Sequence, residues 1–364
     1  MRIAFILPLR GPGGAERVAS LLCNWWVEQR HAVELVTFEA EGSEGSYALD
    51  ERVTLRQIDA FSASGGELMR IRTNLRRLGR IRNALKAFNP DIVVAFTTEA
   101  NIVALLAALR LGVPVVVSER NQPERPGLGR LTPLIRRQTY PLASAIVVQT
   151  DAIAAWAKAH FRVPVHVLPN PVRLTSWWMP VEGHAEAAEI VAAGRLVRQK
   201  GFDILIESFA QIAAAHPGWT LAIYGKGPER ASLEAQIRAL GLDGRVYMLG
   251  VTSDMPGALA KAGLFVLPSR YEGYPNVLIE ALAAGRPVIA ADCPGATAEI
   301  LAGGKYGLLV PPEDKWALTA ALARIISEPD LRSRLAARAR EAVSELDVDI
   351  VGRRWLVLFE SLIA

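Results

Sequence analysis

The segment most able to carry chemistry spans residues 272–285. Glu272 follows an apolar run and should lie in a loop after a strand, whereas Pro275 and Asn276 should begin a helix. Glu280 then lies about one turn into that helix and points back toward its N-terminus. N–H groups at a helix start can bind phosphate, and carboxylates can accept hydrogen bonds from sugar hydroxyls. The segment can therefore frame one polar ligand, although a glutamate on a helix, taken alone, is usually solvated.

Two cations lie five positions apart in Gly194-Arg195-Leu196 and Lys200-Gly201, between an expected strand and an expected helix. An arginine can bind a diphosphate through two parallel hydrogen bonds, and a lysine can add a point charge. The alternative is a pair of solvated surface cations. The diphosphate interpretation gains weight because the pair occurs together with the glutamate segment.

A glycine-rich turn, residues 11–16, follows the first expected strand and contains Gly13 and Gly14. Glycines let the backbone approach a ligand closely, and the helix start that follows offers N–H groups to an anion. The spacing is not that of a dinucleotide-binding fingerprint, and the second expected strand ends at Phe38 without an acidic residue. The alternative is a tight turn that simply requires small residues.

The elements that position these residues form two series in which short apolar runs alternate with helical patterns. The runs are continuously apolar, as expected for parallel strands covered by helices on both faces. We expect strands at 2–7, 33–38, 91–96, 115–118 and 145–149, and then at 189–193, 220–224, 245–249, 263–267 and 287–291. The pattern predicts an α/β protein with two Rossmann-like domains, 1–170 and 171–364, divided near residues 169–187. Ligands of such sheets bind beyond the carboxyl ends of the strands, here in an interdomain cleft.

The composition agrees with two globular domains. The chain has 364 residues, of which 51% are hydrophobic and 21% charged, which excludes disordered, collagen-like and coiled-coil proteins. No apolar run is long enough to span a membrane, and the apolar start is too short for a signal peptide. Two cysteines make neither a disulfide scaffold nor a metal cluster, so we expect a reduced, cytoplasmic setting. Residues 1–172 carry a net charge of +6 and the remainder −2, which indicates anionic partners for the first half.

The motifs occur in a fixed order: Gly13-Gly14-x-Glu16, Gly194-Arg195-Leu196 with Lys200-Gly201, Gly225-x-Gly227-Pro228, and Glu272-x7-Glu280. Together they resemble glycosyltransferase family 4 over nearly the whole chain. The resemblance is nearest to bacterial transferases that extend polyprenyl-diphosphate-linked oligosaccharides. It implies the GT-B fold, in which two Rossmann-like domains face each other across a cleft and a C-terminal helix crosses back to the N-terminal domain. It also implies retaining, metal-independent sugar transfer without a cofactor.

The resemblance further implies roles for individual residues. Arg195 and Lys200 would hold the donor diphosphate, and Glu272 would contact the donor sugar; these three would be catalytic. The remaining donor-binding residues would be Glu280 at the ribose, the amides of Asn276, Val277 and Leu278 at the phosphate, Gly13 and Gly14 closing the cleft, and Gly250 and Val251 beside the base. When the glycosidic bond breaks, negative charge grows on the phosphate, and cations and helix-end N–H groups stabilise that charge without a metal. No general base is assigned, because the leaving phosphate can take the acceptor proton itself.

On the acceptor side, Ser118-Glu119-Arg120 closes an expected strand and would point into the cleft, where Arg120 could meet an acceptor phosphate. The alternative is an internal Glu119–Arg120 pair.

Residues 68–89 hold seven cations and no acid, with an apolar stripe opposite Arg72, Arg76, Arg77 and Arg80. Such a basic amphipathic helix suits an anionic membrane surface or a polyprenyl diphosphate headgroup. The alternative is a helix packed on its own sheet with a solvated basic face.

The sequence thus predicts a transferase that moves a sugar from a nucleotide diphosphate donor to a lipid-linked saccharide. A UDP-linked donor is favoured over a GDP-linked one. We expect it peripherally on the inner face of the cell membrane, in lipopolysaccharide or exopolysaccharide biosynthesis. Two alternatives remain, a sugar-nucleotide epimerase of the same architecture and a non-catalytic nucleotide-sugar-binding subunit. Nucleic acid is not expected as a partner, because no aromatic stacking platform accompanies the basic residues. The one Asp-x-Asp sequence, Asp347-Val348-Asp349, lies between C-terminal helices, and we expect no metal there.

Overall fold

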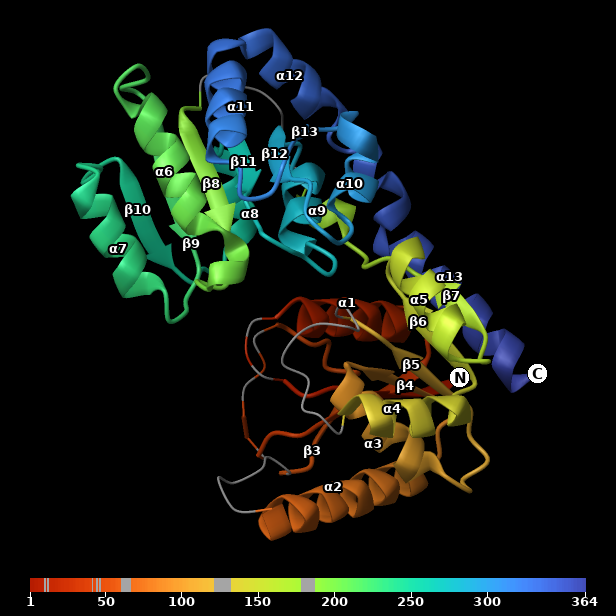
Figure 1. The fold of residues 1–364 in the computed structure, drawn as a ribbon. Helices are drawn as coiled ribbons and strands as arrows, with labels where there is room; N and C mark the ends of the chain where they lie inside the picture. Colours follow the sequence, from red (N-terminus) through yellow and green to blue (C-terminus); the bar gives the residue numbers. More distant parts are fainter. Residues whose placement is uncertain are drawn as a thin grey trace. The chain divides into compact units, whose positions relative to one another are not determined.

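The computed structural model describes the chain except residues 10, 12, 41, 44, 46, 60–66, 121–131 and 178–186, and describes only the backbone of 67–74, 176 and 177. The chain forms two compact units (Figure 1). Unit 1 comprises Met1–Pro171 together with Val348–Ala364, and unit 2 comprises Val172–Asp347. The C-terminal helix therefore belongs to the first unit, which confirms that it crosses back.

Unit 1 contains a parallel sheet whose strands follow the order β3-β2-β1-β4-β5-β6-β7. Its strands are β1 (Arg2–Ile6), β2 (Ala32–Thr37), β3 (Thr54–Gln57), β4 (Ile92–Phe96), β5 (Val115–Ser118), β6 (Ala145–Val148) and β7 (Val165–Val167). Its helices are α1 (Gly14–Glu28), α2 (Glu67–Phe88), α3 (Thr98–Ala108), α4 (Thr132–Thr139), α5 (Asp151–His160) and α13 (Val348–Ile363), with a short 3-10 turn η1 (Tyr140–Leu142). This is the doubly wound arrangement that the alternating pattern predicts.

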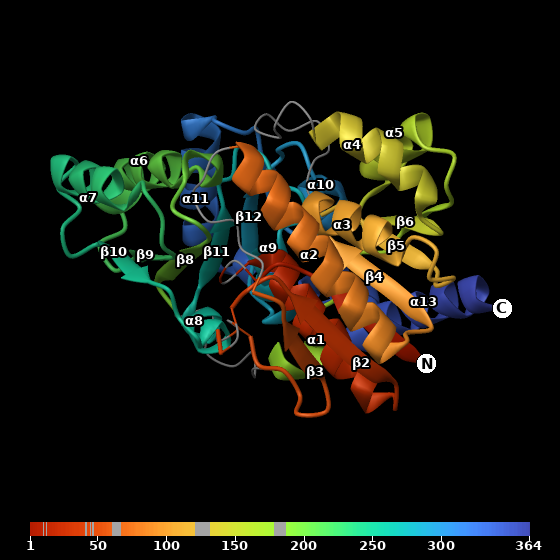
Figure 2. The same ribbon diagram turned by 90° about the horizontal axis from the view of Figure 1, so that it is seen from below.

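The first strand shows how the sheet of unit 1 is covered. Ala4 and Ile6 face a core built with α2, α3 and α5, whereas Ile3 and Phe5 face a second core built with α1 and α13. Because successive strand residues point to opposite faces, a continuous apolar run is what a sheet covered on both faces requires. Figure 2 shows α2 and α3 lying along one face of this sheet.

Unit 2 contains a second parallel sheet, ordered β10-β9-β8-β11-β12-β13. Its strands are β8 (Glu189–Ala193), β9 (Thr220–Tyr224), β10 (Val246–Gly250), β11 (Leu264–Leu267), β12 (Val288–Ala291) and β13 (Leu308–Val310). Its helices are α6 (Phe202–Ala213), α7 (Arg230–Ala239), α8 (Met255–Lys261), α9 (Asn276–Ala283), α10 (Thr297–Ile300), α11 (Lys315–Ser327) and α12 (Pro329–Arg338). Its 3-10 turns are η2 (Leu174–Trp177), η3 (Arg198–Lys200), η4 (Ala302–Gly304) and η5 (Glu341–Leu346). Helices α6, α7, α11 and α12 pack on one face of the sheet, and α8 and α9 pack on the other.

Helix α13 packs against α1 through aromatic side chains. Trp355 and Trp26 meet edge to face with ring centroids 6.3 Å apart, and Trp25 donates its indole N–H to Asp349 at 2.6 Å. Gly352 lies against Trp25, where a Cβ atom would come within 2.4 Å of the indole. Trp25 and Trp26 are therefore buried packing residues and not membrane anchors.

The expected strands match the observed ones to within one or two residues, but β3, β7 and β13 were not predicted. All three are edge strands of three or four residues and are at least partly exposed. β3 and β7 contain polar residues, and β13 has only three residues, so none of them gives the longer apolar run that identifies a strand covered on both faces. Within the described part of the chain, no helix is long and apolar enough to cross a bilayer.

Candidate active site

The carboxyl edge of the unit 2 sheet places the motif residues of the C-terminal half together. Strands β8 and β11 are hydrogen-bonded neighbours, with Phe265 opposite Val191. The loop after β8, which holds Arg195 and Lys200, therefore lies beside the loop after β11, which holds Glu272. Two segments about 70 residues apart in sequence converge because parallel strands end at the same edge.

Lys200 and Glu272 are in direct contact. The Lys200 Nζ atom lies 2.6 Å from Glu272 Oε1, and the Ser269 hydroxyl donates to the same oxygen at 2.5 Å. The Glu272 residue is only 5% exposed, so its carboxylate is held in one place by an ammonium group and a hydroxyl. A compact positive charge beside a fixed carboxylate is what binding a diphosphate next to a sugar requires. Sequence reasoning missed Ser269, whose only signal is its position three residues before Glu272.

Arg195 is exposed in the same loop, with Nη2 3.5 Å from Gln199 Oε1. The loop is anchored by Leu196, which is fully buried and whose N–H donates to the Lys226 carbonyl at 2.9 Å. Gly225, after β9, lies so close that a Cβ atom there would come within 1.8 Å of the Gly194 carbonyl oxygen. The backbones of the two neighbouring loops are therefore in contact, and Arg195 extends to the surface from a loop whose backbone is fixed.

Helix α9 begins at Asn276, as the sequence predicts, and follows Pro275. Leu278 is fully buried, Val277 is partly buried and Glu280 is 3% exposed, so the helix is embedded in the core of unit 2. The Leu278 N–H donates to the Pro275 carbonyl at 3.0 Å and is therefore engaged within the first turn.

Gly250 is the last residue of β10, and Val251 follows it at the same edge of the sheet. Gly250 has a positive φ of 77°, and its carbonyl accepts the Gly225 N–H at 2.7 Å. Val251 is 54% exposed, so it offers an apolar surface next to the loop after β9, whose Gly225 in turn contacts the loop that carries Arg195 and Lys200. A flat aromatic base packs well on such a side chain.

In unit 1, Gly13 precedes α1 as its N-cap, and Gly14 is the first residue of that helix. The Gly13 N–H donates to the Glu16 carboxylate at 2.9 Å. This helix start is therefore capped by its own carboxylate, and an anion binding at Gly13 would have to displace a Glu16 oxygen.

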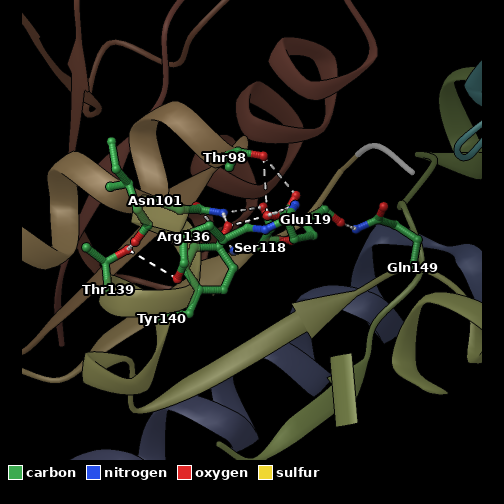
Figure 3. A network of polar contacts seen from close by, with 9 residues as sticks. Thr98, Asn101, Ser118, Glu119, Arg136, Thr139, Tyr140 and Gln149 are labelled. Atoms are coloured by element: carbon green, nitrogen blue, oxygen red, sulfur yellow. Dashed lines mark hydrogen bonds and ion pairs between the residues drawn. The ribbon is translucent and has the colours of Figure 1, made fainter. Parts of the chain in front are cut away.

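The structure corrects the expectation that Ser118 and Glu119 face an acceptor, because both side chains are buried inside unit 1 (Figure 3). The Ser118 hydroxyl donates to the Val147 carbonyl at 3.0 Å, on the neighbouring strand β6. The amide of Asn101 brackets the same residue, donating to the Ser118 carbonyl at 3.0 Å. The end of β5 is therefore fixed to its neighbours.

Glu119 is the centre of a buried polar network (Figure 3). It accepts hydrogen bonds from the Tyr140 hydroxyl and from Thr98 Oγ1 at 3.1 Å, and Arg136 Nη1 lies 3.7 Å away. Burial raises the pKa of Glu119, and these donors and the arginine charge oppose that rise. Burial and the neighbouring carboxylate raise the pKa of Tyr140 well above its ordinary value. Glu119 is thus internal, as the alternative interpretation expected, but its cationic neighbour is Arg136 where Arg120 was expected.

Arg120 lies over the ring of Phe96, with its guanidinium carbon 3.5 Å from the ring centroid, and it donates to Asn170 Oδ1. It is 8% exposed. The packing against the ring and the amide hold the guanidinium at the carboxyl edge of the unit 1 sheet. The residues that follow Arg120, 121–131, lie outside the described residues.

The basic helix α2 forms as predicted, but its basic face is not uniformly solvated. Arg77 is 3% exposed, pairs with Glu99 and stacks on Phe38 at 4.6 Å, which corrects its expected position on the open face. Arg80 is exposed but donates to the carbonyl oxygens of Ile58 and Asp59.

On the same helix, Arg76 is exposed, and Leu75, predicted in the packed stripe, is 64% exposed. The side chain of Arg72 lies outside the description. Ile81 and Leu85 are buried, so the C-terminal half of the apolar stripe packs on the sheet of unit 1, as the alternative interpretation expected.

The Asp-x-Asp carboxylates each hold backbone or side-chain groups in place. Asp347 accepts the Leu174 N–H at 3.2 Å, and Asp349 accepts the Trp25 indole N–H. Among the residues that the structure describes, no three His, Cys, Asp or Glu side chains gather as metal ligands would.

Two family models match the chain in succession. The model described as "Glycosyltransferase Family 4" matches residues 12–176, and the model described as "Glycosyl transferases group 1" matches residues 179–342. The chain belongs to glycosyltransferase family 4. It is accordingly a retaining, metal-independent glycosyltransferase of the GT-B fold.

Two curated relatives match essentially all of the chain. An exopolysaccharide phosphotransferase from Streptomyces coelicolor is 27% identical over 100% of this chain, which spans 41% of that protein's length. An alpha-1,4-N-acetyl-D-galactosaminyltransferase from Campylobacter jejuni is 25% identical over 98% of this chain and 98% of its own length. The Campylobacter enzyme is named for an acceptor that is a saccharide on PP-undecaprenol.

Among solved structures, HepE from Anabaena in complex with UDP is similar in fold, with a TM-score of 0.82. The match covers 99% of this chain and 100% of that one at 21% identity. It supports the two-sheet GT-B fold that the sequence predicts.

Proposed function

We propose that this glycosyltransferase moves a hexose or N-acetylhexosamine from a UDP-linked donor to a polyprenyl-diphosphate-linked saccharide. In this proposal unit 2 binds the donor, and unit 1 binds the acceptor at an anionic membrane surface. The product would serve the assembly of a cell-surface polysaccharide, such as a lipopolysaccharide or an exopolysaccharide.

The contact between Lys200 and Glu272 carries the proposal. It places a cation and a carboxylate 2.6 Å apart at the carboxyl edge of the unit 2 sheet, with Arg195 exposed in the same loop. We assign Arg195 and Lys200 to the diphosphate and Glu272 to the hydroxyls of the donor sugar. Glu280 and the first turn of α9 complete the donor site, and Gly250 and Val251 border the base.

The choice of donor and acceptor is supported by relatives. HepE was solved with UDP bound, and the Campylobacter enzyme is named for a saccharide on PP-undecaprenol. The Campylobacter enzyme matches this chain over nearly its full length, whereas the Streptomyces protein is much longer. We therefore take the acceptor of this chain from the Campylobacter enzyme.

The chemistry follows from charge. The bond between the anomeric carbon and the diphosphate oxygen breaks, so negative charge grows on the phosphate and positive charge on the sugar ring. Arg195, Lys200 and the N-terminal end of α9 stabilise the phosphate charge, and the Glu272 carboxylate orients the sugar. The acceptor oxygen bonds to the anomeric carbon on the face that the diphosphate leaves, and its proton passes to a leaving phosphate oxygen.

Surface residues of unit 1 support a peripheral membrane contact. Helix α3 packs against both α2 and α4. Large apolar side chains are exposed on α4 and η1, where Leu134 is 54%, Ile135 40% and Leu142 48% exposed. Exposed Arg76 and Arg137 lie on α2 and α4, so apolar and cationic groups occur on neighbouring helices, as at an interfacial surface.

The test is nucleotide release from a panel of UDP- and GDP-sugars, with and without a polyprenyl-diphosphate oligosaccharide. We expect acceptor-dependent release of UDP by the wild type and its loss in Glu272→Ala. Glu328→Gln, an exposed carboxylate of the same unit, is the matched control and should keep wild-type release. Interconversion of sugar nucleotides without an acceptor would instead identify an epimerase, and binding without turnover a nucleotide-sugar-binding subunit.

A further inference from the structure

Arg270 joins three segments of unit 2 at the edge of the donor site. Its guanidinium forms a two-pronged pair with Asp203 at the start of α6, with both N–O distances 2.8 Å. Nη1 also donates to the Arg198 carbonyl in η3 at 2.7 Å, and Nε donates to Glu313 at 2.7 Å. The Arg270 side chain is 12% exposed. A partly buried fork of this kind fixes geometry, unlike an ordinary exposed ion pair.

The backbone around Arg270 strengthens the same connection. The Arg270 N–H donates to the Gln199 carbonyl at 2.8 Å, and the Gln199 side chain donates back to the Tyr271 carbonyl at 2.9 Å. Gly201 has a φ of 67°, and a Cβ atom there would come within 2.1 Å of the Pro268 carbonyl oxygen. The two loops therefore run in contact from residue 198 to residue 201 on one side and from 268 to 271 on the other.

Each loop carries one member of the donor-site pair, Lys200 within these contacts and Glu272 directly after them. Lys200 ends η3, directly after Arg198 and Gln199. Glu272 lies two residues after Arg270. The Arg270 fork therefore joins the two loops next to both Lys200 and Glu272, whose Nζ and Oε1 atoms lie 2.6 Å apart.

The pair between Arg270 and Asp203 stays charged on both sides near neutral pH. Burial alone would raise the pKa of Asp203, but the hydrogen bonds and charge of Arg270 outweigh it and leave that pKa below its ordinary value. Asp203 is therefore ionised throughout the neutral range. The hydrogen bond to Asp203 raises the pKa of Arg270, burial opposes it, and Glu313 adds to the rise.

We propose that Arg270 is a positioning residue for sugar transfer: it holds the η3 loop against the loop after β11, so that Lys200 and Glu272 meet the donor together. This rests on the proposed function of the Lys200–Glu272 pair. Arg270 contacts no substrate in this proposal and acts only through the two loops. A lysine at this position has a single ammonium and cannot reproduce a fork to Asp203 while also reaching Arg198 and Glu313.

The first test compares the kinetics of Arg270→Lys with those of Arg324→Lys. A misplacement of about 1 Å near reacting groups can cost about 100-fold in rate, so we expect kcat to fall about 10- to 100-fold in Arg270→Lys. The donor KM should change by less than about 3-fold, because the loss concerns the transition state more than binding. Arg324→Lys, which alters an exposed pair of the same unit, should keep kcat within about 2-fold.

The second test separates positioning from a general structural role. Lys200→Met should lower kcat strongly in the wild type but much less in Arg270→Lys, because the lysine is already misplaced there. If the two kcat losses instead multiply, or if folded Arg270→Lys keeps wild-type kcat, the proposal is wrong. Should Arg270→Lys fail to fold, Asp203→Asn breaks the charge of the same fork with little change in shape, and it must show the same non-multiplicative loss.

A third measurement does not depend on activity. If the wild type releases no nucleotide with any donor and acceptor, the proposed function fails. Urea unfolding then tests by itself whether Arg270 holds the two loops together. Arg270→Lys and Lys200→Met should shift the urea midpoint by less together than the sum of their single shifts, since both loosen one contact between the same loops. Additive shifts of the urea midpoint would contradict the proposed role of Arg270.

Discussion

The Tyr140→Phe variant tests the buried network around Glu119. The Tyr140 hydroxyl donates to Glu119 and accepts a hydrogen bond from Asn101 Nδ2 at 2.8 Å, and the side chain is fully buried. Removing this one oxygen leaves a buried carboxylate with one donor fewer and an amide N–H without its acceptor. Leaving such groups unsatisfied costs about 1–3 kcal/mol, so we expect the free energy of unfolding to fall by about 2 kcal/mol near neutral pH.

The pH dependence of this cost has a definite sign. Burial raises the pKa of Glu119, so the folded state disfavours its ionised form. Stability from this group is fully present below its unfolded pKa of about 4.3 and is lost as the pH rises through the folded value. Tyr140→Phe removes a donor that favours the carboxylate, so it raises the folded pKa further. The cost of the substitution should therefore be larger at pH 8.5 than at pH 5.

The assay is urea unfolding followed by far-UV circular dichroism at both pH values. The matched control is Tyr247→Phe, which deletes the same atom at a side chain that is 41% exposed and donates to the Gly244 carbonyl. The control should cost at most a few tenths of a kcal/mol at either pH. A Tyr140→Phe cost equal to that of the control, or one that shrinks as the pH rises, would refute the role given to the network.

Two glycines and two cysteines provide further predictions. Gly352→Ala forces a methyl group against Trp25 and should lower the urea midpoint, with a cost of about 1–3 kcal/mol, although alanine is the better helix former. Gly79→Ala, in open space on α2, should instead raise the free energy of unfolding by about 0.5–1 kcal/mol. A Gly352→Ala variant more stable than the wild type would contradict the packing described for Gly352 and Trp25. Burial raises the pKa of Cys293 to about 11 and that of Cys23 still further. At pH 8 only about one Cys293 thiol in a thousand is ionised, so a disulfide reagent should label neither cysteine until urea is added, and rapid native labelling would contradict this burial.

The sequence predicted the strands that are buried on both faces, because their apolar runs are continuous and short. It also placed the start of α9 at Asn276 and located Lys200 and Glu272 in loops that follow strands. That these two loops are neighbours follows from the pairing of β8 with β11, which the sequence did not predict. It could not find edge strands such as β7, whose residues are only partly buried. Edge strands share the composition of loops, so their pairing is decided by the sheet and not by their own pattern.

Buried charges were the least predictable feature of the site. Arg77 was placed on an open basic face by helical spacing, but Glu99 and the ring of Phe38 draw it into the interior. Glu119 was expected to face a ligand, and its burial depends on Tyr140, which is distant in sequence. Arg270 carries no motif signal of its own, because its partners lie in two other stretches of the chain, at residues 198–203 and at Glu313. Such pairings arise from tertiary contacts that spacing along one element does not encode.

The division of unit 1 between two stretches of the chain also governs how it can fold during synthesis. The face of its sheet that carries Phe5 and Phe96 is completed by Trp355 of α13. A ribosome that has released residues 1–171 has therefore produced a sheet with one aromatic face only partly covered, and unit 2 must be made before that cover arrives. The second unit can finish first, although it comes later in the chain. The first unit would then need protection from aggregation for as long as translation of the intervening residues takes.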